Sequence, residues 1–280
     1  MRMTLATMAL CCSPLAAVAP HATADQHATA QLVVETTAAI PGQTLHVGIN
    51  FQIERDWHLY WNGRNDSGAP IEFTLDLPEG WTAGPTQWPA PVRHLMPGEI
   101  LDHIYEKTVT LIVPVQVPAA AKGEFKLTAD VRWLVCNEAC VAEKAKVIAT
   151  VPIAPTAQPG PNAPLFAAAR LRVPKPLPTT GAAIPRVSIT AGAIQMEADG
   201  ATGLSFFPAL DCPEIRNLSE AGTSDGPKPR LTMSFSESHA TPPAPSGVLE
   251  VRYPDKTAWY QITPPAPPAE SKKAPSPAAH

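Results

Sequence analysis

The chain has 280 residues and a formal net charge of −4, and its 21 lysines and arginines are spread along the sequence. This scatter excludes the concentrated basic patch with which proteins hold nucleic-acid phosphates, so no nucleic-acid partner is expected. The 34 prolines far exceed the usual share of about one residue in twenty. Because proline disfavours helix interiors and central strands, this composition favours short strands, turns and linkers.

The N-terminus has the pattern of an export signal. Arg2 precedes a mostly apolar run from Met3 to Val18, and Ala22-Thr23-Ala24 forms a small-residue cleavage site. The apolar run is short for a membrane span, which needs roughly 20 residues. We therefore expect a cleaved signal and an exported protein that does not span the membrane. The alternatives are an uncleaved anchor and a lipid anchor at Cys11 or Cys12, although neither cysteine has a leucine three residues before it.

From about Gln31 to Ile153, apolar and polar residues alternate with a period of two. The runs with this pattern are Leu45–Ile53, Ile71–Leu77, Val109–Val115 and Phe125–Val135. Strict alternation is typical of strands with one buried face and one solvated face. Turn signals such as Asn65-Asp66-Ser67-Gly68 separate the runs. Short strands at such spacing predict an immunoglobulin-like β-sandwich.

The rest of the sequence predicts a linker, a smaller β-domain and a tail. Pro152–Pro185 is rich in proline and alanine and is expected to be a semi-rigid linker, with one short helical turn within Pro164–Arg172. The strand pattern resumes from Arg186 to about Thr263. The expected fold class is all-β, with two immunoglobulin-like β-sandwich domains joined by a Pro-rich linker. The expected divisions are a signal peptide at 1–24, the first sandwich at 26–155, the linker at 156–185, the second domain at 186–264 and a disordered tail at 265–280.

Removal of the expected signal leaves three cysteines: Cys136, Cys140 and Cys212. Export would place them in an oxidising compartment, where disulfides persist. Three cysteines can form one disulfide and leave one thiol over. We expect Cys212 to be the unpaired thiol, with pairing to another molecule as the alternative.

Alternation places Cys136 and Cys140 at the tip of a hairpin. Trp133 and Val135 point inward, so Cys136 points to the other face, and Cys140 begins the returning strand after three residues. A hairpin with a three-residue loop sets the two cysteines opposite each other, with Cα atoms about 4.5 to 5.5 Å apart. A disulfide needs about 4.4 to 6.8 Å, so it can form here without backbone movement.

The position of this disulfide favours redox chemistry over a structural role. The bond would close a loop of about five residues and contribute only about 2 kcal/mol in the chain-entropy model. Exposed disulfides also tend to be the labile ones. From these residues alone, an inert hairpin disulfide remains open as the alternative. A soft-metal site with His94, His103 or Met96 as further ligands is a second alternative, although the sequence has no second Cys-x-x-Cys pair and no matched histidine pair.

Several separate motifs share one order along the first half. They are Trp57–Trp61, Asn65–Pro70, Leu77–Trp81, Trp88–Pro91 and Trp133–Cys136 followed by Cys140. In this order they resemble the N-terminal periplasmic domain of the DsbD/ScsB family of thiol–disulfide interchange proteins, over about residues 30–155. The second half, with Phe206-Phe207-Pro208 and Gly247-Val248-Leu249, is more weakly similar to the second β-domain of the ScsB-like branch.

The resemblance implies an immunoglobulin-like domain whose two cysteines cycle between dithiol and disulfide. Electrons would come from a membrane-embedded thiol–disulfide transporter and leave to periplasmic thioredoxin-fold proteins. Carried over by position, Cys136 and Cys140 would be the redox pair. The residues themselves leave open which cysteine attacks first, and the analogy with the family favours Cys140. The family's shielding loop has its counterpart in Met96–Tyr105, with Tyr105 near the pair. Full-length members continue into membrane helices, which this sequence lacks, so we expect a standalone domain that receives its electrons from a separate membrane protein.

The charged residues near the cysteines are expected to have opposite effects on the stability of a thiolate. Glu138 lies between the cysteines and Glu143 follows them, and nearby negative charge disfavours the thiolate. Arg132 and Lys144 act in the opposite direction.

The sequence therefore predicts a periplasmic thiol–disulfide interchange protein, an oxidoreductase component of the protein-disulfide reductase type that needs no cofactor and no metal. The alternatives are a tandem β-sandwich binding module whose disulfide is only structural and a periplasmic copper-binding protein.

Overall fold

The computed structural model describes residues 26–178, 180, 184–190, 193–237 and 244–263. The expected signal peptide, with Cys11 and Cys12, and the expected tail at 265–280 lie outside the described residues. None of the described helices combines the length and the apolar character needed to cross a membrane.

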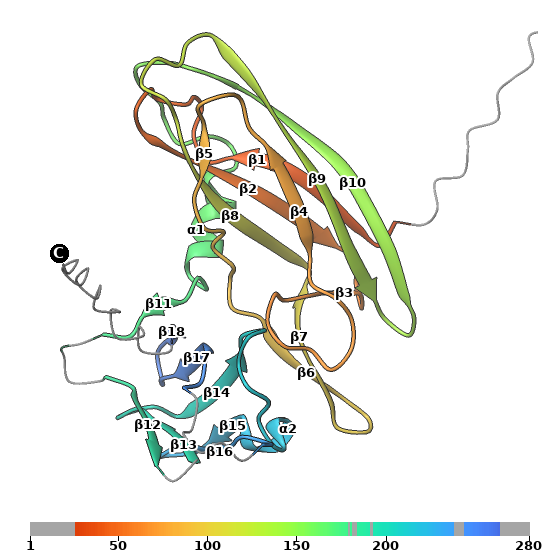
Figure 1. Cartoon of the computed structure of the whole chain (residues 1–280), viewed down its shortest axis with the longest axis vertical. Helices are drawn as coiled ribbons and strands as arrows, with labels where there is room; N and C mark the ends of the chain where they lie inside the picture. Colours follow the sequence, from red (N-terminus) through yellow and green to blue (C-terminus); the bar gives the residue numbers. More distant parts are fainter. Residues whose placement is uncertain (1–25, 179, 181–183, 191–192, 238–243, 264–280) are drawn as a thin grey trace, which may run out of the picture.

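Two sheets build the first half of the chain (Figure 1). Their strands are β1 (Ala28–Val34), β2 (Thr44–Ile53), β3 (His58–Tyr60), β4 (Glu72–Asp76), β5 (Thr82–Ala83), β6 (Val92–Met96), β7 (Ile100–Glu106), β8 (Thr108–Gln116), β9 (Glu124–Cys136) and β10 (Cys140–Pro152). One sheet has the order β1-β2-β8-β5, and the other has the order β10-β9-β3-β7-β6 with β4 also paired to β9. These sheets confirm the predicted all-β class.

The inward residues of the alternating runs meet between the two sheets. Val47, Ile49 and Phe51 of β2 are fully buried against the inner face of β9. The rings of Phe51 and Trp133 join the two sheets edge to face, with centroids 5.2 Å apart. Since successive side chains of a strand alternate between faces, this packing turns Cys136 away from the core between the sheets.

The Pro/Ala-rich segment after β10 packs on the first sandwich. The helical turn expected there is present as α1 (Ala163–Arg170). Its Phe166 is fully buried and packs with Val33 of β1 and Ile112 of β8. The segment predicted as a linker therefore contributes a small hydrophobic cluster of its own.

The second half contains two further sheets and one short helix. Its elements are β11 (Lys175–Pro176), β12 (Arg186–Thr190), β13 (Ala193–Glu197), β14 (Gly203–Pro208), α2 (Leu218–Ala221), β15 (Thr223–Asp225), β16 (Arg230–Ser234), β17 (Gly247–Arg252) and β18 (Thr257–Ile262). The sheet orders are β11-β18-β17-β14-β15 and β12-β13-β16. Leu204, Phe206 and Leu249 form part of a second core, in which the free thiol of Cys212 is fully buried.

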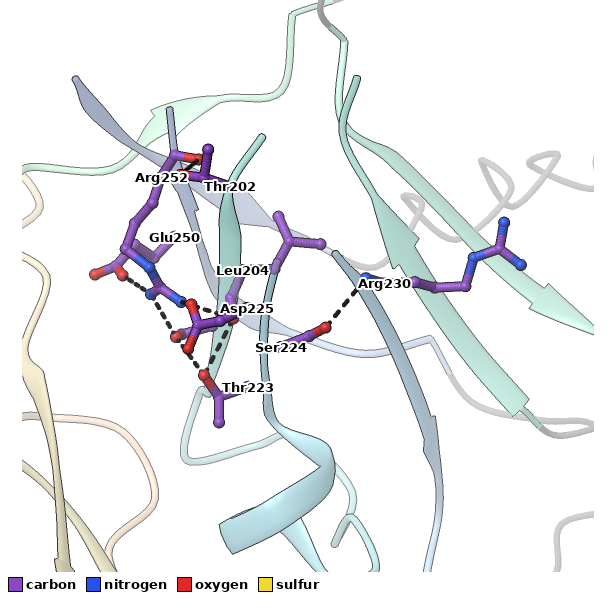
Figure 2. Close-up of polar contacts among 9 residues, drawn as sticks. Thr202, Leu204, Thr223, Ser224, Asp225, Arg230, Glu250 and Arg252 are labelled. Atoms are coloured by element: carbon purple, nitrogen blue, oxygen red, sulfur yellow. Dashed lines mark hydrogen bonds and ion pairs between the residues drawn. The ribbon is translucent and has the colours of Figure 1, made fainter. Parts of the chain in front are cut away.

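A polar network ties three strands of the second half together (Figure 2). The Arg252 guanidinium donates to Asp225 Oδ1 at 2.6 Å and to Ser205 Oγ at 2.8 Å. It also forms an ion pair with Glu250 on its own strand. One side chain on β17 thus bonds both to the neighbouring strand β14 and to β15 beyond it.

Buried contacts also cross the proposed boundary between the two halves. Phe207 of β14 packs into the first core, 6.4 Å from the Trp61 ring and 5.3 Å from the His103 ring. Arg64 Nε donates to the carbonyl oxygen of Cys212 at 2.7 Å. The halves are therefore joined by packing as well as by the chain between them.

His103 sits inside this contact as a neutral imidazole. Burial lowers the pKa of His103 to about 4, although its hydrogen bond to the Arg64 carbonyl opposes the shift. Nδ1 lies 2.6 Å from that carbonyl oxygen and is the protonated ring nitrogen. Nε2 is buried without a partner among the described residues.

We predict that Phe166→Ala lowers the free energy of unfolding of the first half by about 3 to 5 kcal/mol, because it empties a fully buried site under β8. Urea unfolding followed by tryptophan fluorescence measures the change. Leu171→Ala is the matched control, since the Leu171 side chain is 77% exposed directly after the helix. Equal midpoints for the two variants would contradict the anchoring role of α1.

His103 should make the protein lose stability between pH 6.5 and pH 4. In this range the unfolded chain protonates this histidine, whose ordinary pKa is 6.5, while the folded protein keeps it neutral. The stability from this group is complete above pH 6.5 and falls by about 3 kcal/mol as the pH drops to 4. Denaturation midpoints measured across this range should fall less steeply for His103→Asn, which keeps a donor for the Arg64 carbonyl. If the midpoints of the unaltered protein and of His103→Asn fell equally with pH, His103 would not be the group responsible.

Candidate functional site

Cys136 and Cys140 form a disulfide at the tip of the hairpin of β9 and β10. Figure 1 shows these two strands side by side. They face each other in the strand register, with Cα atoms 4.1 Å apart. This distance is slightly below the range of about 4.4 to 6.8 Å that most disulfides show. A backbone hydrogen bond from Asn137 N to the Ala139 carbonyl closes the three-residue loop. The hairpin and its disulfide are present as expected from the sequence, but the Cα atoms lie closer together than the expected 4.5 to 5.5 Å.

The two sulfur-bearing residues differ in their access to solvent. Cys136 is only 2% exposed and packs against Tyr60 and Ile104, with Leu134 beside them. Cys140 lies in the exposed tip of the hairpin. An incoming reactant therefore meets Cys140, while Cys136 is covered.

A row of polar side chains on β3 lies against this pair. The Tyr60 hydroxyl lies 3.8 Å from Cys140 Sγ and 3.3 Å from His58 Nε2. His58 in turn faces Cys136 in the strand register. The His94 ring, from β6, lies 5.0 Å from the His58 ring. These residues share the outer face of the sheet with the cysteines.

The protonation states of Tyr60 and His58 allow a hydrogen bond to be donated to sulfur. Burial raises the pKa of Tyr60, although hydrogen bonding with Ser67 opposes the shift, so the phenol stays protonated at neutral pH. Burial and the charge of His94 lower the pKa of His58, which is therefore neutral at pH 7. The Tyr60 hydroxyl can thus donate a hydrogen bond to a thiolate at Cys140.

The turn after β3 holds the Tyr60 ring in place. A Cβ on Gly68 would lie 2.1 Å from Tyr60 Cζ, and Gly68 has a φ of +62°, so both space and backbone require glycine here. Ser67 donates its backbone N–H (2.9 Å) and its hydroxyl (2.5 Å) to the buried carboxylate of Asp102. The sequence predicted a turn at these residues but did not predict that the turn supports the cysteine pair.

The structure corrects the position expected for Tyr105. Tyr105 lies in β7, is 3% exposed and belongs to the core between the sheets, where its hydroxyl donates to the Pro89 carbonyl at 2.6 Å. Its neighbour Ile104 faces Cys136 instead. The segment Met96–Tyr105 is also largely strand rather than loop. Adjacent residues of a strand point to opposite faces, so the assignment was off by one residue.

Glu143 also has a different role from the one expected. Its carboxylate accepts hydrogen bonds from Trp133 Nε1 at 2.9 Å and from the backbone N–H of His27 at 2.7 Å. These bonds fasten β10 to the start of β1, on the face away from the sulfurs. Glu138 remains in the exposed loop between the cysteines, as expected.

The metal ligands considered from the sequence do not converge on the pair. His94 lies beside His58, but His103 packs towards Trp61 and Phe207 of the contact between the halves. Within the described part of the chain, no group of three histidine, cysteine, aspartate or glutamate side chains could hold a metal ion. The copper-binding alternative gains no support from this arrangement.

Comparison with known proteins finds a family model that is similar to the first half of the chain. Residues 29–152 match the sequence profile of the N-terminal domain of the thiol:disulfide interchange protein DsbD. This range includes both sheets of the first sandwich and both cysteines of the pair. No curated protein sequence matches the chain.

Two solved structures are similar to this one. The N-terminal periplasmic domain of ScsB from Proteus mirabilis is 11% identical, with a TM-score of 0.54; the match covers 86% of this chain and 95% of that domain. The DsbD N-terminal domain from Neisseria meningitidis, in its reduced form, is 13% identical; the match covers 46% of this chain and 90% of that one, with a TM-score of 0.28. The match to the ScsB domain shows a shared fold across both halves. The TM-score of the match to the DsbD domain is too low to carry an argument.

We predict that Tyr60→Phe slows alkylation of reduced Cys140 at pH 7 by about tenfold, because a hydrogen bond to a charged acceptor is worth roughly 1.5 to 3 kcal/mol. Iodoacetamide labelling followed by mass spectrometry measures the rate at this cysteine. Tyr105→Phe is the matched control, since its hydroxyl bonds to Pro89 on the opposite face. A rate unchanged in Tyr60→Phe would show that the Tyr60 hydroxyl does not stabilise the thiolate.

Proposed function

We propose that this chain is a thiol–disulfide interchange protein that carries two electrons through Cys136 and Cys140, since residues 29–152 match the family model of the DsbD N-terminal domain. The observation that carries the proposal is the unequal burial of the two cysteines at a hairpin tip, with Cys140 exposed and Cys136 covered. In such a pair one sulfur is accessible to a partner, and the covered sulfur can resolve the mixed disulfide. The export pattern at the N-terminus and the periplasmic origin of the similar ScsB domain support the periplasm as its compartment.

The disulfide contributes little that the hairpin does not already have. β9 and β10 pair without a break from Cys136 opposite Cys140 to Glu124 opposite Pro152. The bond closes a very short loop, so its effect on chain entropy is only about 2 kcal/mol. This redundancy supports a reactive disulfide over the inert one of the binding-module alternative.

In the proposed exchange, the reduced protein gives two electrons and two protons to a partner disulfide. The Cys140 thiolate attacks one partner sulfur, forming a mixed disulfide and releasing the other partner sulfur as a thiolate. The thiolate of Cys136 then attacks Cys140 Sγ, re-forms the intramolecular disulfide and releases the second partner thiolate. The two cysteine protons end on the partner's thiols.

Tyr60 has a defined role in this sequence of steps. Its hydroxyl, 3.8 Å from Cys140 Sγ, stays protonated at neutral pH and donates to the attacking thiolate. The same ring covers Cys136 and keeps it from reacting with other molecules. Tyr60 is thus a stabilising and shielding residue, while the bond-making atoms are the two sulfurs.

The proposed partners are a membrane-embedded thiol–disulfide transporter and periplasmic thioredoxin-fold proteins. A groove of about 430 Å³ on the outer face of the sheet offers them a contact surface, with Arg132, Leu134 and Lys144 among its lining residues. Leu134 also packs beside Cys136. A partner seated in this groove would therefore lie next to the hairpin tip.

The reduction potential of the Cys136–Cys140 bond tests the proposal. Equilibration in glutathione or dithiothreitol buffers, followed by counting of free thiols, should give a value within roughly −120 to −270 mV, as known exchangers show. The Cys212→Ser variant should give the same value, since that thiol is buried in the second core. A value well below about −300 mV would mark a structural disulfide and overturn the proposal.

A further inference from the structure

His58 is a buried, titratable side chain two hydrogen bonds away from the exposed cysteine. It lies on β3, is 5% exposed, and its Nε2 lies 3.3 Å from the Tyr60 hydroxyl oxygen. The same oxygen lies 3.8 Å from Cys140 Sγ. Sulfur, hydroxyl and imidazole therefore form a row from Cys140 to a base inside the sheet.

The strands hold this row in place without help from the disulfide. His58 and Tyr60 are two residues apart on one strand, so their side chains share a face of the sheet. His58 lies opposite Cys136 in the register of β3 and β9, and Cys136 lies opposite Cys140 in the register of β9 and β10. Reduction breaks the bond between the sulfurs but not these backbone pairings, so we expect the reduced Cys140 thiol to stay beside the Tyr60 hydroxyl.

The reduced Cys140 thiol needs a proton acceptor before it can attack. An ordinary thiol has a pKa of about 8.5, so only a few per cent of it is thiolate at neutral pH. The carboxylates of Glu143 and Asp102 accept hydrogen bonds from other parts of the first half. A general base can act directly or through one bridging water, and here the Tyr60 hydroxyl takes the place of that water. His58 is therefore a base in a suitable position.

The groups around His58 keep it neutral and still able to accept a proton. Burial lowers the pKa of His58, and the charge of His94, whose ring lies 5.0 Å away on β6, lowers it further. The carboxylates of Asp102 and Glu106 on β7 oppose this shift. Glu106 lies opposite His58 in the strand register, and Cys136 faces it from β9. The imidazole is thus unprotonated at pH 7, and two nearby carboxylates stabilise the imidazolium that proton uptake creates.

We propose that His58 accepts the proton of the reduced Cys140 thiol through the Tyr60 hydroxyl. The thiol gives its proton to the Tyr60 oxygen while the hydroxyl gives its own proton to His58 Nε2, so a thiolate and an imidazolium replace a neutral thiol and a neutral imidazole. The thiolate then attacks one sulfur of the partner disulfide. The proton returns through the same hydroxyl to the partner thiolate that this attack releases, and His58 is neutral again.

His58 is a positioning residue in this scheme, because it acts through Tyr60 and does not touch the sulfur. The assignment rests on the exchange function proposed above and adds to it the group that activates Cys140. It also gives the exchange a characteristic pH dependence. Transfer to His58 keeps the proton inside the protein, so the amount of thiolate formed in this way stays nearly constant while His58 is neutral.

The rate of alkylation of Cys140 by iodoacetamide, measured across pH on the reduced full-length chain, tests the proposal. Iodoacetamide reacts with the thiolate, so an ordinary thiol slows about tenfold for each pH unit below its pKa. At about pH 6.5 the unaltered protein should react about tenfold faster than His58→Gln, which keeps hydrogen-bonding groups but cannot take up a proton. At about pH 9, where the thiol ionises without help, the two rates should agree.

Two further variants separate proton transfer from a structural effect. His46→Gln makes the same substitution on the other sheet, where His46 pairs with Glu35, and should react like the unaltered protein at both pH values. Tyr60→Phe removes the bridge, so adding His58→Gln to it should cause no further loss at about pH 6.5. Mass spectrometry assigns each rate to Cys140.

Two outcomes would overturn the proposal. One is an equal ratio of the unaltered and His58→Gln rates at both pH values, since the substitution would then act through structure alone. The other is an independent loss from each substitution in the double variant. The reduction potential of the disulfide tests the exchange function separately. A potential in the range of known exchangers together with a constant rate ratio would reject the role of His58 and leave the exchange function standing.

Discussion

The register between β9 and β10 is the constraint on which the site depends. Cys136 and Cys140 can bond only because they oppose each other at the last paired position of the hairpin. The register is fixed from inside the sandwich, where Trp133 packs edge to face on Phe51 and donates to Glu143 of the facing strand. A slip of one residue would turn every side chain of β9 to the opposite face and send Cys136 into the core. Ordinary core packing therefore places Cys136 on the outer face of the sheet.

The outer face then divides the two sulfurs into different environments. Tyr60 and Ile104, from two neighbouring strands, cover Cys136, while Cys140 is exposed at the start of β10. A thiol covered in this way is a poor target for small oxidants and a ready intramolecular nucleophile, because only Cys140 is within its reach. Because one cysteine is exposed and the other is covered, the exposed one would react with the partner first and the covered one would resolve the mixed disulfide.

The sequence was sufficient to predict the hairpin but not the residues that cover it. Alternation within β9 is a local pattern, so the outward direction of Cys136 and the pairing with Cys140 could be derived from adjacent residues alone. The contact of Tyr60 with Cys140 depends on β3 lying between β7 and β9, which is a long-range pairing. Tyr105 was expected near the pair because the resemblance placed its segment there, but it points to the other face. A single sequence likewise gave no sign that Phe166 would anchor the proline-rich segment or that His103 would be buried between the halves.

The short strand β3 connects the site to the second half of the chain. Tyr60 faces the cysteines, and Trp61, the next residue, packs 6.4 Å from Phe207 of β14. The backbone N–H of Trp61 bonds to the His103 carbonyl, and the N–H of Arg64 bonds to the Pro208 carbonyl. A three-residue strand has few hydrogen bonds of its own, so contacts at its ends determine how rigidly it is held. The second half therefore influences the cysteine pair indirectly, because it helps to fix the strand that carries Tyr60.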